Sequence, residues 1–167
     1  WFENKLEVMI QFMENHPQIM VAVNDAEIVD DGLNSSGRTQ LQQIKNMGLS
    51  PDAIKLGCCS VFRKGMINLL LPIPEDCVAH DTWLSRLASV LGQRQLVENS
   101  LQYYRRHAQN TSDWLGSSTD QKQRSHLFIE KKSADVRYWC SRRIKAVSAL
   151  KKRLQESDSP LLKTPDA

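Results

Sequence analysis

The stretch Ile19–Asp30, IMVAVNDAEIVD, decides how this chain of 167 residues folds. Its β-branched and apolar residues predict two short strands, IMVAV over 19–23 and AEIVD over 26–30, separated by Asn24 and Asp25. The residues that follow, DDGLNSSGR, are rich in Gly, Asn and Ser and predict a loop. The segments on either side then decide the fold class.

Helices are expected before and after this stretch. Apolar residues at helical spacing predict an amphipathic helix over 3–15, which Pro17 ends. The sequence TQLQQIKNMG over 39–48 predicts a short helix closed by its glycine. A turn at Gly57, a short extended piece and a helix over 63–70 should follow. The apolar positions of the first helix are Leu6, Met9, Ile10 and Met13.

The second half of the chain continues the alternation. We expect a helix over 80–91, two strands over 94–98 and 100–106, and a largely helical segment over 121–155. The apolar stripe of that last segment is Val136, Cys140, Val147, Leu150 and Leu154. Alternating helices and strands predict an α/β fold, but the strands are too few for a complete doubly wound sheet.

Composition and charge limit the classes of protein. Hydrophobic residues make up 41% and charged residues 25%, which is typical of a soluble globular chain. None of the four cysteines forms a C-x-x-C pair, which favours a reduced cytoplasm. Residues 121–153 contain eleven Lys and Arg against Glu130 and Asp135. This basic segment is expected to meet an anionic partner, such as a membrane surface or a nucleic acid.

The chain begins at Trp1 and enters a helical pattern with no capping residue before it. A helix start usually carries Ser, Thr, Asp or Asn. We therefore expect the chain to be a fragment of a larger domain.

Several residues are candidates for a site, and each has a structural alternative. His80 and Asp81 stand at a predicted helix start, where a carboxylate can cap the helix or take a proton from a hydroxyl. Trp83 on the same turn is either a core anchor or a wall for a sugar ring. Asp25 is either a turn residue or a ligand group at a strand end.

A second group of candidates lies further along the chain. His107 is either a surface residue or a ligand for a metal or phosphate, and Arg105 and Arg106 beside it suit phosphate oxygens. A metal hydrolase built from His80, Asp81 and His107 is a weaker alternative, since their spacing matches no motif.

Five segments, taken in order, resemble the second half of the family 2 glycosyltransferases, notably the bacterial rhamnosyltransferase-like branch. They are WFENKLEVMIQFMENHP, NDAEIVDDG, GCCSVFRKGMINLLLPIPED, HDTWLSRLASVLG and YYRRHAQN. The resemblance covers about residues 1–112, with a basic helical extension over 113–155 and a disordered tail over 156–167 left outside it. It implies the acceptor-side half of a GT-A fold. Trp1, Lys5 and Leu6 look like the tail of an acidic motif whose metal-binding residues would precede Trp1.

The resemblance also implies roles for residues of this chain. Asp81 looks like the general base, and His80 like its neighbour at the acceptor site. The acceptor-binding set would include Gly57, Cys58, Trp83 and Asp25, although Asn24 replaces a serine that usually precedes the aspartate. The metal or diphosphate set would be His107, Arg105 and Arg106.

The implied reaction is inverting transfer from a nucleotide-diphospho-sugar to a saccharide or lipid-linked hydroxyl in cell-surface polysaccharide synthesis. Mg²⁺ or Mn²⁺ would be the cofactor. The enzyme would be cytoplasmic, with possible peripheral contact of residues 121–153 with the inner membrane, and the fragment alone would be inactive. The alternative is a non-enzymatic module that binds anionic membrane or nucleic acid through the same basic helix, although nucleic acid is the less favoured of the two partners.

Overall fold

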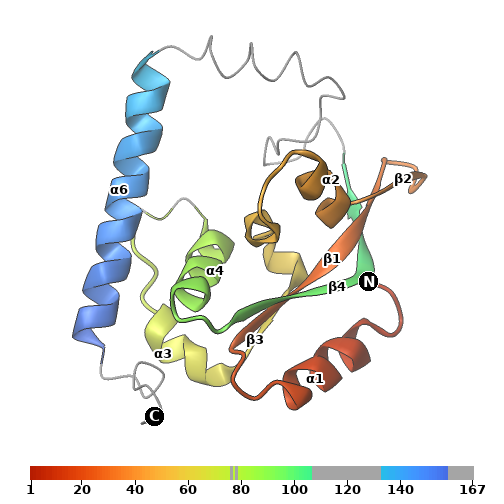
Figure 1. The fold of residues 1–167 in the computed structure, drawn as a ribbon, viewed down its shortest axis with the longest axis horizontal. Helices are drawn as coiled ribbons and strands as arrows, with labels where there is room; N and C mark the ends of the chain where they lie inside the picture. The colour runs from red at the N-terminus through yellow and green to blue at the C-terminus, as the bar shows by residue number, and fades with distance from the viewer. Residues whose placement is uncertain (76, 78, 107–132, 158–167) are drawn as a thin grey trace.

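A computed structural model describes residues 1–75, 77, 79–106 and 133–157 (Figure 1). They form a mixed α/β arrangement around an open sheet of four strands. The central strand is β1 (Val21–Val29), and β4 (Arg94–Arg105) runs parallel to it along one edge. On the other edge, β3 (Ser60–Phe62) and β2 (Ser35–Thr39) both pair antiparallel with β1. The predicted α/β class is confirmed at this level.

The prediction of two strands around Asn24 and Asp25 is wrong, because β1 is one continuous strand. The pairing with β4 shifts register on both sides of Asp25. Val23 and Ala26 pack in the same core cluster although they are three positions apart, which strict alternation would forbid. An irregularity of this kind accommodates extra residues without ending the strand. The strands predicted over 94–98 and 100–106 are likewise one strand, β4.

The two faces of the sheet are covered differently. Helix α1 (Lys5–Asn15) packs on one face, where its methionines meet Ala22, Val97 and Leu101. The other face carries the larger core, formed with α2 (Gln40–Asn46), α3 (Ile67–Leu70) and α4 (His80–Val90). Three short 3₁₀ turns connect these elements: η1 (Pro51–Ala53), η2 (Gly57–Cys59) and η3 (Lys64–Met66).

Helix α1 buries a different stripe from the one predicted. Its buried residues are Lys5, Met9 and Met13, whereas Leu6 and Ile10 are more than half exposed. The spacing of four residues between Lys5, Met9 and Met13 places them on one face of the helix. The buried stripe therefore starts with a lysine.

Local end signals bound these helices, and Gly48 closes α2 as predicted. Thr39 and Gln42 form a reciprocal capping box at the start of α2. Gly48 and Gly92 take positive φ angles of 69° and 67° just after α2 and α4. The expected helix over 63–70 is present as η3 followed by α3.

The last helix, α6 (Ser133–Glu156), packs its C-terminal turns beside α3 and α4 (Figure 1). Leu150 is buried in the large core, and the Arg153 guanidinium donates to the backbone oxygens of Leu69, Leu71 and Pro72 at 2.9, 2.7 and 2.5 Å. Val147, predicted on the apolar stripe, is 62% exposed. Residues 121–132 and 158–167 lie outside the described residues.

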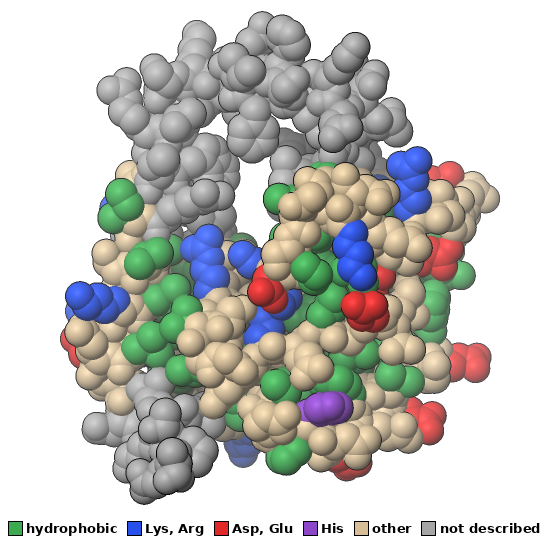
Figure 2. Space-filling model, in the orientation of Figure 1, with side chains coloured by type: hydrophobic (Ala, Val, Ile, Leu, Met, Phe, Trp, Pro, Cys, Tyr) green, Lys and Arg blue, Asp and Glu red, His purple; other side chains and the backbone are tan. Residues whose placement is uncertain are grey.

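Figure 2 shows apolar and basic side chains interspersed on the side of the molecule where α6 lies. Among the described residues, no helix is both long enough and apolar enough to cross a bilayer. The predicted peripheral contact with an anionic membrane stays a prediction.

Candidate functional site

Helix α4 begins at His80, and Asp81 lies in its first turn. Ala79 is the N-cap residue and makes no side-chain cap, so the helix start depends on the carboxylate that follows. The Asp81 Oδ1 accepts the Thr82 N–H at 2.6 Å, and its Oδ2 accepts the Gly57 N–H at 3.2 Å. Both oxygens are thereby oriented by backbone donors, while Asp81 remains partly exposed and His80 is exposed.

Gly57 lies against the first two residues of α4. A Cβ at this position would lie 3.3 Å from His80 Nε2, slightly closer than ordinary van der Waals contact, and 3.4 Å from the Asp81 Cβ, at the limit of ordinary contact. The structure brings Gly57, His80 and Asp81 together, and we call this grouping the carboxylate site.

A second group of side chains adjoins it through the Gly57–Cys58 peptide. Lys5 is only 5% exposed, and its ammonium donates to the Cys58 carbonyl oxygen at 2.8 Å and to Gln102 Oε1. The Gln102 amide in turn donates to Cys58 Sγ at 3.3 Å. Cys59 Sγ lies 3.9 Å from Cys58 Sγ. We call Lys5, Cys58, Cys59 and Gln102 the thiol site.

The two cysteines differ in acidity because of this environment. Hydrogen bonding from Cys59 lowers the pKa of Cys58 to about 6, with help from the Gln102 amide and the Lys5 charge and against the effect of burial. The pKa of Cys59 is raised, because it is the donor to Cys58 and is buried. Burial lowers the pKa of Lys5. The exposed Cys58 is therefore the stronger acid of the pair.

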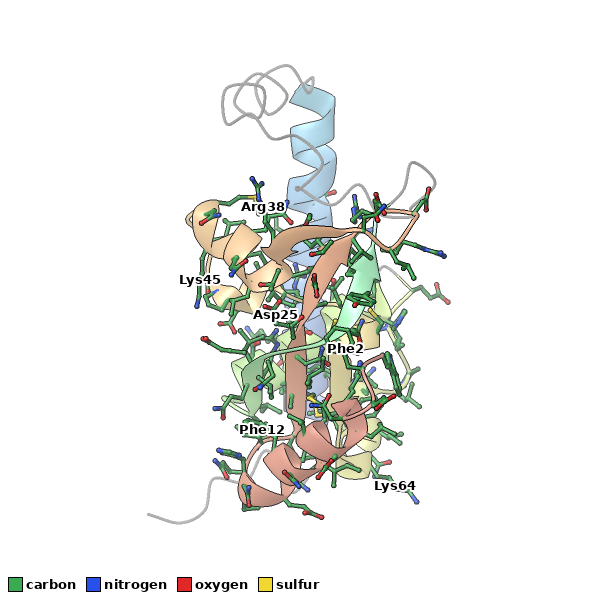
Figure 3. The ribbon with its side chains drawn as sticks, turned by 90° about the vertical axis from the view of Figure 1, so that its right-hand side faces the viewer. Phe2, Phe12, Asp25, Arg38, Lys45 and Lys64 are labelled. Carbon is green, nitrogen blue, oxygen red and sulfur yellow. The ribbon has the colours of Figure 1, made fainter. Side chains whose placement is uncertain are left out.

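Asp25 lies midway along β1. In the view of Figure 3 it lies between helix α2, where Lys45 is labelled, and helix α1, where Phe12 is labelled. It is buried, and its Oδ1 accepts the Ala26 N–H at 2.8 Å and the Leu41 N–H at 2.9 Å. Asp25 is therefore neither at a strand end nor in a turn. Its visible role is to join the irregular part of β1 to the first turn of α2.

Trp83 lies in the large core and is 2% exposed. Its indole Nε1–H donates to the Leu70 carbonyl at 3.0 Å, and the Arg153 guanidinium lies 5.8 Å from the ring centroid. In this structure the ring anchors α4 against α3 and offers no face to a sugar. The core-anchor alternative is the one the geometry fits.

The candidates for a metal or diphosphate site are only partly described. Arg105 ends β4, and the Arg106 N–H donates to the Val29 carbonyl at 2.8 Å, which places both arginines at the end of the sheet. His107 lies outside the described residues. Within residues 1–75, 77, 79–106 and 133–157, no group of three or more His, Cys, Asp or Glu side chains is arranged to hold a metal ion.

The sequence prediction missed the contacts of Lys5 and Gln102. Lys5 had a usable signal, since it is in phase with Met9 and Met13 on the buried stripe of α1. Gln102 had none, because it follows the buried Leu101 in a strand where alternation would turn it outward.

No known family model matches this chain, and no curated protein matches it either.

Proposed function

We propose that this chain is the acceptor-side part of an inverting glycosyltransferase of the GT-A type, with Asp81 as the general base. The observation that carries the proposal is the Asp81 carboxylate, held by the Gly57 and Thr82 backbone N–H groups at a helix start while still open to solvent. A base must be rigidly placed and reachable by the proton that it removes. The resemblance of the HDTW segment to family 2 glycosyltransferases supports the same role.

In the proposed reaction, the acceptor hydroxyl oxygen forms a bond to the anomeric carbon of the donor sugar. Its proton passes to the Asp81 carboxylate as the nucleoside diphosphate leaves from the opposite face. The two backbone donors orient the carboxylate without neutralising it, so that at least one lone pair remains for the proton. His80, exposed beside Gly57, lies where an acceptor would approach.

The divalent cation and the nucleotide are proposed to be bound outside the described residues, because these do not assemble a metal site. A bound cation would stabilise the charge on the leaving diphosphate. The part played by this chain is to bind the acceptor and to receive its proton. The basic residues at the end of β4 would lie at the diphosphate side of such a site.

The test is Asp81→Asn in the longest natural chain that contains residues 1–167. Asparagine keeps the size of the side chain and an acceptor for the Gly57 N–H, but it is not a base. Sugar transfer is expected to fall about 100- to 10,000-fold, with donor affinity unchanged. Transfer is followed with radiolabelled nucleotide sugar and donor affinity by calorimetry.

Asp31→Asn is the matched control, since Asp31 is an exposed loop carboxylate. It should leave transfer unchanged. Full transfer by Asp81→Asn would refute the assignment of the base.

A further inference from the structure

The thiol site has the features of a reactive cysteine, a chemistry that the proposed sugar transfer does not use. Cys58 is exposed, whereas the adjacent Cys59 is buried. Lys5 is a buried cation, and the contacts described for its ammonium are the Cys58 carbonyl, the Gln102 amide oxygen and the Trp1 ring at 4.3 Å. In this part of the structure, no carboxylate forms an ion pair with it. A thiolate at Cys58 would supply the missing negative charge.

Each element packed around Cys58 presents a group that bears on this charge. Helix α1 provides Lys5, β4 provides the Gln102 amide, and η2 provides the Cys59 thiol, which can donate to a thiolate at Cys58. The acidic groups nearby act elsewhere: Asp25 on β1 raises the pKa of Cys59, and Asp81 is directed at Gly57 N. One cation and two neutral donors therefore surround an accessible sulfur, an environment that activates a thiol.

We propose that Cys58 is a modification site whose thiolate reacts with small disulfides to form a mixed disulfide. The thiolate attacks one sulfur of the disulfide, the Cys58–S bond forms as the original S–S bond breaks, and the other half leaves as a thiolate. No other oxidant is consumed. Cys59 is unsuited to resolve the adduct, because neighbouring Cα atoms lie only about 3.8 Å apart, closer than disulfides usually allow.

The reaction of Cys58 with a disulfide does not depend on the proposed sugar transfer. The effect of the adduct on activity does rest on that proposed function, because an adduct on Cys58 would lie one peptide away from the contact between Gly57 and Asp81. We expect the mixed disulfide to obstruct the acceptor side of the carboxylate site.

The experiment measures the reaction of the whole chain with dithiodipyridine, which releases a coloured thiopyridone at each attack. The reference is an unstructured peptide of residues 55–61 carrying Cys59→Ser. A thiol with a pKa of about 6 holds more thiolate at low pH than an ordinary cysteine, but each thiolate is less nucleophilic. Relative to the peptide, we expect Cys58 to react about ten-fold faster at pH 6, about two-fold faster at pH 7 and about ten-fold slower at pH 9.

Three variants show which cysteine releases the thiopyridone in the fast phase. Cys58→Ser should remove the fast phase at pH 6, and Cys77→Ser should keep it, because Cys77 is a half-buried thiol that donates to the Ala79 carbonyl. Lys5→Met should move the fast phase to higher pH. Peptide mapping should find the first label on Cys58.

Reaction at pH 6 no faster than that of the peptide, or a first label on another cysteine, would overturn the proposal. The pH profile of the unmutated chain decides this even where Lys5→Met does not fold.

Discussion

Two successive segments of β1 are made of different residues and do different work: Val21–Val23, which we call the apolar half, and the pair Asn24 and Asp25, which we call the polar half. Val21–Val23 is apolar, regularly paired on both edges, and fully buried. Asn24 and Asp25 come next, equally buried but polar, and there the register with β4 shifts. The strand thus passes from three apolar residues to a buried polar pair, before the apolar residues Ala26, Ile28 and Val29 complete it.

The difference shows that two kinds of burial, apolar and polar, follow one another along the same strand. The apolar half holds the sheet between α1 and the larger core, where burial is favourable in itself. The polar half must satisfy buried groups, and it lies near the thiol site, since Asp25 acts on the pKa of Cys59. Polar burial costs free energy unless hydrogen bonds satisfy the buried groups, as the Ala26 and Leu41 N–H groups do for Asp25.

The largest effect is expected from the core that covers the apolar half. Trp83→Ala removes the ring that packs against α3 and Arg153, and leaves the Leu70 carbonyl without its indole donor. We expect the free energy of unfolding to fall by about 3–5 kcal/mol, measured by urea denaturation. Trp1→Ala is the control, because Trp1 is 73% exposed, and it should cost about 1 kcal/mol or less. Similar costs for the two variants would contradict the core role of Trp83.

The polar half is tested at Asp25. Asp25→Ala leaves the Ala26 and Leu41 N–H groups buried without their acceptor, so we expect a loss of about 2–4 kcal/mol in the free energy of unfolding. Asp25→Asn keeps a side-chain oxygen and should lose less. Asp31→Ala, at an exposed loop position, should change stability by no more than about 0.5 kcal/mol. A neutral Asp25→Ala would mean that these bonds do not hold β1 to α2.

The contrast between the halves also explains what could be predicted from the sequence. A local signal was sufficient where one residue type determines the backbone, as with Gly48 at the end of α2. The predicted helix start at residue 80 also agrees with the start of α4. Local signals failed at Asn24 and Asp25, because turn-forming residues were read as a turn although tertiary packing extends the strand through them.

The residues of the candidate site likewise divide into those that the sequence predicted and those that it missed. The grouping of Gly57 with His80 and Asp81 was predicted through a resemblance to a family, and the structure brings these residues together. The link from Lys5 to Gln102 joins residues 97 positions apart, and no local pattern encodes such a contact. For Trp83 the sequence leaves two alternatives open, a core anchor and a ligand wall, and its 2% exposure fits the core anchor.

The smallest effect is expected where α6 closes the core beside the apolar half. Arg153→Ala removes a guanidinium that binds three backbone oxygens, partly in contact with solvent, so we expect a loss of about 1–2 kcal/mol in the free energy of unfolding. Hydrogen exchange should quicken in α6, since docking holds this helix more than its own propensity does. Lys152→Ala removes only an exposed pair with Glu156 at 3.9 Å and should cost less than about 0.5 kcal/mol. Unchanged exchange in Arg153→Ala would show that the apolar contacts of Ala149, Leu150 and Leu154 anchor the helix, and that the core closes without the arginine.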